Sequence, residues 1–217
     1  MPYHGLVIFL GQILLLVLVP LLDNGEQATP LLLALTATVL ALVTLVMIGY
    51  RRLSLSLGVI GAIAFLWAVW IGKETVQARG PAIVALVVTY CASVYLGLYY
   101  AFTADMRVSQ RILCGAAGFV MLGFIFTAAH GIVARFDLGT YSLAVASEGN
   151  RLPRWVDFLW LSFSTLTTAG FGDMTPVGSW PCAVASLEGL CGVLYPATLI
   201  ARIAAIPASG ESERSCW

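Results

Sequence analysis

FLWLSFSTLTTAGFG, running from Phe158 to Gly172, is an uncharged stretch of fifteen residues that ends against Asp173. It is apolar enough to enter a membrane, but a helix needs about 20 residues to cross one. Its second half carries hydroxyls and glycines that a lipid-facing helix would not contain. Non-helical backbone is tolerated at membrane depth only where protein or a water-filled path covers it. We therefore predict that this stretch enters the membrane, turns and leaves on the same side.

The composition is that of an integral membrane protein. The chain has 217 residues, of which 60% are hydrophobic and 10% are charged, whereas a soluble domain carries about 25% charged residues. The formal net charge is zero, so no basic surface indicates a nucleic-acid partner. The five cysteines show no CxxC or Cys/His spacing, which argues against a metal site or a disulfide framework. No catalytic constellation is present, and neither enzyme activity nor a cofactor is expected.

Charged residues divide the chain into six apolar segments long enough to cross a membrane. Six spans and one re-entrant segment place both termini on the same side, which the positive-inside rule makes cytoplasmic. The count gives this orientation little support, since six Lys and Arg residues fall inside and five outside. The predicted spans are Gly5–Leu22, Pro30–Tyr50, Leu53–Gly72, Gly80–Ala104, Ile112–Ala134 and Pro181–Ile203.

Gly170 and Gly172 stand at alternate positions near the end of the uncharged stretch. A row of carbonyl groups that all point to one side requires unusual backbone dihedrals at alternate residues, and glycine adopts them without a Cβ penalty. Such a row of oxygens can replace the hydration shell of a potassium ion. One chain supplies one strand of oxygens, so a closed ring requires several chains around an axis.

The stretch Thr165-Leu-Thr-Thr-Ala-Gly-Phe-Gly-Asp173 resembles the signature sequence of potassium channels, whose core reads Thr-Val-Gly-Tyr-Gly-Asp. Phe171 replaces the tyrosine, as occurs in that family, and Ala169 stands where valine is usual. The resemblance covers roughly Ile112–Ile203. Four further residues stand where simple bacterial channels have a pore-helix aromatic residue, a proline, a tryptophan and a hinge glycine: Trp160, Pro176, Trp180 and Gly192.

The resemblance implies a homotetramer that conducts potassium ions passively, with K⁺ as the permeant ligand. It implies that each subunit is an all-α membrane protein of six transmembrane helices, with a re-entrant pore helix and selectivity filter between helices five and six. The carbonyl groups expected to bind the ion, with the Thr168 hydroxyl at the inner end, belong to the strand Thr168, Ala169, Gly170, Phe171 and Gly172. The residues expected to support this filter are Trp160, Ser164, Thr167, Asp173 and Glu188.

Several of these supporting positions carry more specific expectations. In the family the aspartate at position 173 is held behind the filter by pore-helix groups, which makes the Trp160 indole nitrogen a donor to Asp173. Ser164 replaces the buried acidic partner that the family has on the pore helix. Gly192 and Pro196 are interpreted as a gating hinge in the last span, because proline removes a helix hydrogen bond. The alternative explanation, which can hold together with the hinge, is close packing of the small residues Gly189, Gly192, Ala183 and Ala185.

Glu188 is the one acidic side chain within a predicted span. A carboxylate in a membrane is costly and is normally paired. Pore-helix hydroxyls, Ser164 or Thr165, and His130 are its expected partners. In the favoured interpretation Glu188 is neutral or hydrogen-bonded and fastens the last span to the pore helix. In the second interpretation a Glu188–His130 pair makes the open state sensitive to pH.

Three regions are predicted. Residues 1–110 form four helices without the repeated arginines of a voltage sensor, residues 111–206 form the pore domain, and residues 207–217 form a short cytoplasmic tail. The expected location is the cell membrane, in contact with lipid, as a multi-pass protein of a bacterial inner membrane. The sequence does not indicate whether a separate regulatory subunit binds the channel. The alternative functions are a weakly selective monovalent cation channel, a pore-like transporter subunit and a non-conducting membrane scaffold.

Overall fold

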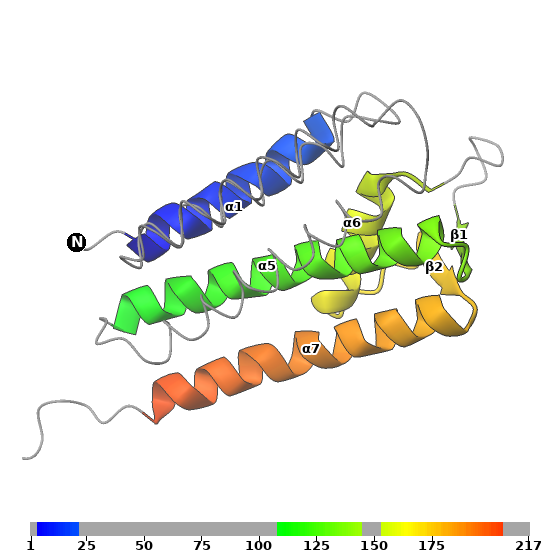
Figure 1. Ribbon diagram of the computed structural model, residues 1–217. Coiled ribbons are helices and arrows are strands. Elements are labelled where there is room, and N and C mark those ends of the chain that lie inside the picture. Colours follow the sequence, from blue (N-terminus) through cyan, green and yellow to red (C-terminus); the bar gives the residue numbers. More distant parts are fainter. Residues whose placement is uncertain (1–3, 22–107, 145–152, 206–217) are drawn as a thin grey trace, which may run out of the picture.

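A computed structural model describes residues 4–21, 108–144 and 153–205 of the chain. Three predicted spans, Pro30–Tyr50, Leu53–Gly72 and Gly80–Ala104, lie outside the described residues, as does the predicted tail. The described elements are α1 (His4–Leu21), α5 (Val108–Arg135), β1 (Thr140–Leu143), α6 (Trp155–Leu166), β2 (Met174–Val177) and α7 (Ser179–Ala204), which Figure 1 labels.

Two of the described helices are long and apolar enough to cross a membrane, over Arg111–Arg135 and Ser179–Ala204. They pack side by side and run in opposite directions (Figure 1), as two consecutive spans must. They correspond to the predicted fifth and sixth spans and extend beyond them at both ends. α1 occupies the first predicted apolar segment to within one residue at each end and runs along α5.

The short helix α6 packs against both α5 and α7. A buried cluster joins it to α5, where Val120, Met121 and Phe124 surround Leu159. Phe9 of α1 packs against the same cluster. α6 has only 12 residues, about 18 Å at 1.5 Å per residue, so it is too short to cross a bilayer and ends inside the protein.

A small antiparallel sheet corrects the all-α expectation. β1 pairs with β2, with Tyr141 opposite Pro176 and Leu143 opposite Met174. No strand was predicted for these residues from the sequence. The sheet forms because the chain leaves the uncharged stretch in an extended conformation, and its backbone groups need partners once Met174 is buried. The strand β1 supplies those partners.

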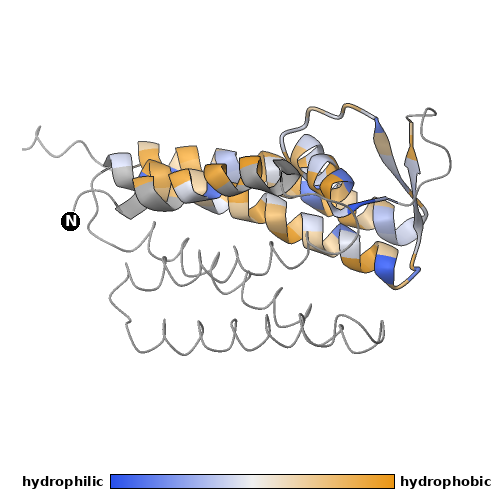
Figure 2. Cartoon of the chain, turned by 90° about the horizontal axis from the view of Figure 1, so that it is seen from above, coloured by the Kyte–Doolittle hydropathy of each residue, from blue (hydrophilic) through white to orange (hydrophobic). Residues whose placement is uncertain are grey.

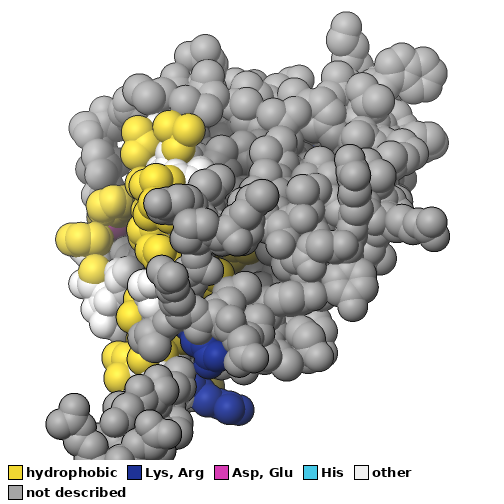
Figure 3. Space-filling model, turned by 90° about the vertical axis from the view of Figure 1, so that its left-hand side faces the viewer, with side chains coloured by type: hydrophobic (Ala, Val, Ile, Leu, Met, Phe, Trp, Pro, Cys, Tyr) yellow, Lys and Arg dark blue, Asp and Glu magenta, His cyan; other side chains and the backbone are white. Residues whose placement is uncertain are grey.

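The surfaces of α5 and α7 are mostly apolar along their length, and basic residues lie near the helix ends. Hydrophobic residues cover much of both helices (Figure 2). Arg111 lies near the start of α5 and Arg202 near the end of α7, which is the same end of the antiparallel pair. Figure 3 looks onto this end and shows basic side chains gathered below the hydrophobic ones. A basic end on an apolar helix pair is typical of a membrane interface.

Candidate functional site: the 167–173 segment and its supports

The start of α6 fixes where the uncharged stretch enters the fold. The Arg154 backbone N–H donates to Asp157 Oδ2 at 2.7 Å, and an acidic residue at this position also suits the positive end of the helix dipole. Further along, Phe158 and Leu161 pack under Met174 of β2. α6 is thus tied to the strand that follows the turn as well as to the helix that precedes it.

The backbone after α6 adopts positive φ at every second residue. The φ angles are 59° at Thr168, 57° at Gly170 and 77° at Gly172. Thr168 pays a Cβ penalty for this conformation, whereas the two glycines do not. The alternation is the dihedral pattern that the sequence analysis associated with carbonyl groups facing one side.

Hydrogen bonds to α6 show which way several peptide groups are turned. Ala169 N–H and Gly170 N–H both donate to the Ser164 carbonyl, at 2.8 Å and 3.2 Å, and Thr168 N–H donates to the Thr165 carbonyl at 3.0 Å. No peptide bond is cis among the described residues, and in a trans peptide the C=O points opposite to the following N–H. The carbonyl groups of Thr167, Thr168 and Ala169 therefore point away from α6.

Ser164 and Thr167 support this segment differently from what their side chains suggested. The Ser164 hydroxyl donates to the Leu161 carbonyl at 2.9 Å, and the Thr167 hydroxyl donates to the Phe163 carbonyl at 2.6 Å. Both hydroxyls are therefore bonded within the α6 turn itself. The anchoring atom is the Ser164 backbone oxygen, which receives the two N–H groups described above.

Trp160 supports the outer part of the segment by stacking. Its ring lies on Phe171 with centroids 5.0 Å apart and planes 18° apart. Among the described residues no hydrogen bond joins the Trp160 indole to Asp173. The Asp173 backbone carbonyl instead accepts a hydrogen bond from Ala144 N–H at 2.8 Å, so the end of the segment is held by the chain that follows β1.

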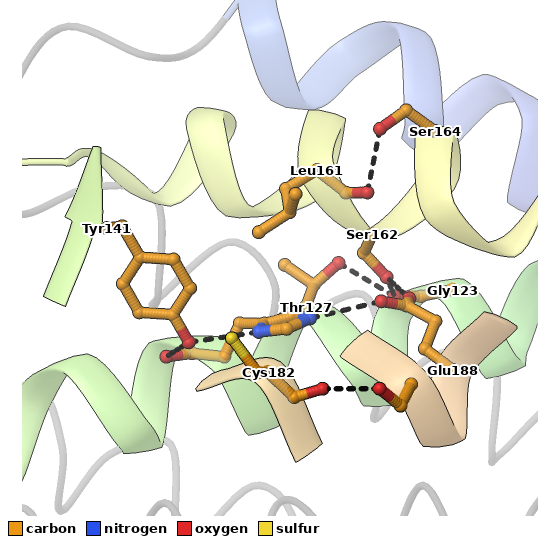
Figure 4. Close-up of polar contacts among 10 residues, drawn as sticks. Gly123, Thr127, Tyr141, Leu161, Ser162, Ser164, Cys182 and Glu188 are labelled. Carbon is orange, nitrogen blue, oxygen red and sulfur yellow. Dashed lines mark hydrogen bonds and ion pairs between the residues drawn. The ribbon is translucent and has the colours of Figure 1, made fainter. Parts of the chain in front are cut away.

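Glu188 of α7 is fully buried and lies between two polar partners (Figure 4). Its Oε2 lies 3.0 Å from His130 Nε2, and its Oε1 is hydrogen-bonded to the Ser162 hydroxyl. The contact with His130 is the one that the sequence analysis named. The expected contact with Ser164 or Thr165 was wrong, since the α6 hydroxyl that faces α7 is that of Ser162.

Three further polar groups complete this buried cluster. Ser162 also donates to the Gly123 carbonyl at 2.7 Å, and Thr127 donates to the same carbonyl at 2.7 Å. The Tyr141 hydroxyl of β1 lies 3.0 Å from His130 Nδ1. Burial raises the pKa of Tyr141 to about 12, so this hydroxyl remains neutral at physiological pH.

Sequence reasoning missed Ser162, Tyr141 and Thr127. Ser162 lies about half a helical turn from Ser164, so these two side chains point to different sides of α6. That spacing was the available signal, because only one of the two serines can face α7. Tyr141 lies between the predicted fifth span and the uncharged stretch, where the sequence predicted no helix or strand.

Gly192 lies against the last residue of α6. A Cβ at position 192 would collide with the Leu166 carbonyl oxygen and lie 2.9 Å from the Leu166 carbonyl carbon. α7 continues through Pro196 to Ala204, and the Tyr195 hydroxyl donates to the Gly115 carbonyl of α5 at 2.7 Å. Close packing therefore has a specific contact at Gly192. At Gly189, which the same explanation included, an added Cβ meets no atom within 4 Å among the described residues.

The described residues hold no group of three or more His, Cys, Asp or Glu side chains that could bind a metal ion. The atoms that this segment offers to a ligand are backbone oxygens turned away from α6. Oxygens of this kind suit a weakly held monovalent cation.

Comparison with known proteins gives two matches. Residues 121–208, which include α6, the 167–173 segment and α7, match the ion channel family model. Protein LctB of Geobacillus stearothermophilus is 42% identical over 59 residues, which are 26% of this chain and 42% of that protein. The chain thus spans less than half the length of this relative. No solved structure matches the chain. The match over residues 121–208 supports the resemblance that the signature sequence indicated, and this part of the chain is similar to an ion-channel domain.

Proposed function

We propose that the protein is a potassium-selective channel that conducts K⁺ passively through a pore shared by four identical chains. The observation that carries this proposal is the backbone of residues 168–172. Positive φ at alternate residues and N–H groups bonded to α6 leave a row of carbonyl groups free to face an ion. The proposed ion ligands are the carbonyl groups of Thr168, Ala169, Gly170 and Phe171, with Gly172 completing the strand.

A single chain leaves apolar surface that supports assembly. Within one chain Trp160 and Phe171 are exposed although they lie beside the proposed ion path. α7 is largely uncovered over its length, and packing against other copies would bury its apolar side chains. The large hydrophobic residues exposed along α7 are Trp180, Leu187, Leu190, Val193, Leu194 and Ile200.

The proposed topology places the protein in the cell membrane as a multi-pass subunit. α5 and α7 are its fifth and sixth spans, α6 is the re-entrant pore helix, and both termini are cytoplasmic. Arg111 and Arg202 lie at the proposed cytoplasmic end, and Arg135 lies at the other end of α5, so the positive-inside rule gives this orientation little support. Residues 1–110 form the remaining spans, and no arginine-rich helix drives gating by voltage.

A weakly selective monovalent cation channel is the second proposal. In the described residues Asp173 lacks a hydrogen bond to Trp160, and Ser164 turns its hydroxyl to its own helix. The filter is then held at its inner end by backbone bonds, and at its outer end by the Trp160–Phe171 stack and the Ala144 contact. A looser outer end would lower the discrimination between K⁺ and Na⁺.

The test is ion flux in liposomes that contain the purified full-length protein. Potassium flux should exceed sodium flux, and Gly170→Asp should abolish it, because the substitution places a side chain at φ 57° and a charge beside the ion path. Ser179→Asp is the control, since it adds the same charge at an exposed site at the start of α7. Equal K⁺ and Na⁺ flux would favour the weakly selective channel. Absence of flux would favour the scaffold, and flux that survives Gly170→Asp would contradict the filter assignment.

A further inference from the structure

Four consecutive contacts connect the hairpin to α5 through the buried cluster. They join Tyr141 Oη to His130 Nδ1 at 3.0 Å, His130 Nε2 to Glu188 Oε2 at 3.0 Å, Glu188 Oε1 to Ser162 Oγ, and Ser162 Oγ to the Gly123 carbonyl at 2.7 Å. Figure 4 shows this row of side chains passing from β1 through α5 and α7 to α6. Each contact needs one hydrogen between its two atoms.

One placement of the hydrogens gives every contact a hydrogen of its own, and it starts from the last contact. Ser162 has one hydroxyl hydrogen and two neighbouring acceptors, the Gly123 carbonyl and Glu188 Oε1. A backbone carbonyl only accepts hydrogen bonds, so the contact with Gly123 is a hydrogen bond only when that hydrogen lies on the Gly123 side. The Glu188 oxygen that faces Ser162 must then carry a hydrogen of its own. The other Glu188 oxygen accepts from His130 Nε2–H. His130 Nδ1 is left as an acceptor. The Tyr141 hydroxyl lies 3.0 Å from Nδ1 and 3.4 Å from the His130 carbonyl, and its hydrogen goes to the nearer acceptor, Nδ1.

We propose that Glu188 is a neutral carboxylic acid that donates a hydrogen bond to Ser162, and that His130 is the neutral Nε2–H tautomer. Tyr141, His130, Glu188 and Ser162 then supply one hydrogen each for four contacts. An ionised Glu188 would leave the Ser162 hydrogen shared between two acceptors. It would also place charge at a site where both side chains are 0% exposed, which a membrane disfavours.

The titratable groups around His130 come from two elements in the described part of the chain. Tyr141 belongs to β1, and Glu188 belongs to α7. Cys182 of α7 lies near the Tyr141 hydroxyl. The contribution of α6 is the Ser162 hydroxyl, which does not titrate in this range. One proton on Glu188 therefore decides whether the row of hydrogen bonds is complete.

The proposal makes Glu188 a positioning residue for the ion path. Through Ser162 it ties α7 to α6, and the Ser164 carbonyl of α6 holds the segment of residues 168–170. The role in conduction rests on the proposed function, whereas the protonation state does not. A glutamine at position 188 can replace a neutral acid, because its amide N–H donates to Ser162 and its carbonyl accepts from His130.

Infrared spectroscopy of the full-length protein in lipid vesicles at neutral pH tests the protonation state. The carbonyl stretch of a protonated carboxylic acid should appear in the wild-type protein and be absent from Glu188→Gln. In a His4→Gln background His130 is the remaining histidine, and ¹⁵N NMR should report a protonated Nε2 and a bare Nδ1. A missing acid band or a doubly protonated ring would overturn the proposal.

Potassium flux supplies the functional arm. Glu188→Gln should keep flux within about twofold of wild type, whereas Glu188→Ala should lower it at least about tenfold by leaving Ser162 and His130 without a partner. Equal losses in the two variants would contradict the neutral acid. If the wild-type protein conducts no ion, the proposed function fails, and the infrared and NMR results still decide the protonation state.

Discussion

Gly192→Ala should lower the stability of the protein and its potassium flux, whereas Gly189→Ala should lower neither, although the two glycines lie three residues apart on α7. An added Cβ at position 192 would collide with the Leu166 carbonyl oxygen and lie 2.9 Å and 3.1 Å from the Leu166 carbonyl carbon and Cα. An added Cβ at position 189 meets nothing within 4 Å among the described residues. The colliding atoms at position 192 are backbone, so no side-chain rotation relieves the overlap.

The magnitudes follow from these two environments. Overpacking of this kind costs about 1–3 kcal/mol per subunit, so Gly192→Ala should lower the free energy of unfolding by that amount. It should also reduce potassium flux, because Leu166 is 0% exposed and α6 must move to relieve the contact. Gly189→Ala should instead stabilise α7 by about 0.5–1 kcal/mol, the gain of replacing a glycine within a helix.

Denaturant unfolding in detergent and flux in liposomes, measured on both variants, give the comparison. A hinge that depends on flexible glycines predicts that both substitutions stiffen α7 and impair gating similarly. Close packing predicts an effect at position 192 alone. If Gly192→Ala unfolds and conducts like the wild-type protein, the Leu166 contact and the packing explanation built on it are refuted.

Three further predictions concern the supports of the site. Ser162→Ala should lower the free energy of unfolding, measured by urea titration, by about 1–3 kcal/mol because it leaves buried polar groups unpaired. Ser164→Ala should lower it by well under half of that amount, since the Ser164 hydroxyl bonds within its own helix. Equal losses in the two variants would contradict the assignment of Ser162 to the buried cluster. Burial raises the pKa of Tyr141 to about 12, above its usual value near 10. The contribution of Tyr141 to the stability of the protein should therefore be fully present below about pH 10 and be lost toward pH 12. Thermal melts of Tyr141→Phe should lack this loss, and an unchanged loss in that variant would assign it to another group. Asp157→Ala removes the hydrogen bond to the Arg154 N–H and should lower the free energy of unfolding by about 0.5–2 kcal/mol, seen as a lower melting temperature. Asp157→Asn should keep most of the wild-type stability. If both variants melt like the wild-type protein, this helix cap does not contribute to stability.

The apolar segments and the signature sequence were sufficient to predict the helices that the structure describes. Ile112–Ala134 and Pro181–Ile203 lie within α5 and α7, because hydropathy over about 20 residues reflects a strong physical constraint. The ends of these helices differ from the prediction by one to four residues, since polar residues such as Ser109 continue a helix as readily as they end it.

The hairpin and the buried cluster could not be predicted in the same way. β1 depends on pairing with β2, more than 30 residues later, and four-residue strands carry little periodic signal. Glu188 was identifiable as a buried acid because it stands alone in an apolar segment. Its choice of Ser162 over Ser164 depends on the rotation of α6 about its axis, which the sequence of α6 alone does not determine.

The central claim, potassium selectivity, is tested most directly by the reversal potential of the current through the purified protein in a planar bilayer. The bilayer separates two solutions with unequal potassium concentrations and equal sodium concentrations. A filter formed by the carbonyl groups of residues 168–171 predicts a reversal potential that moves by close to 59 mV, roughly the one-electron Nernst slope, for each tenfold potassium gradient. A reversal potential that stays near zero when potassium on one side is replaced by sodium would contradict potassium selectivity.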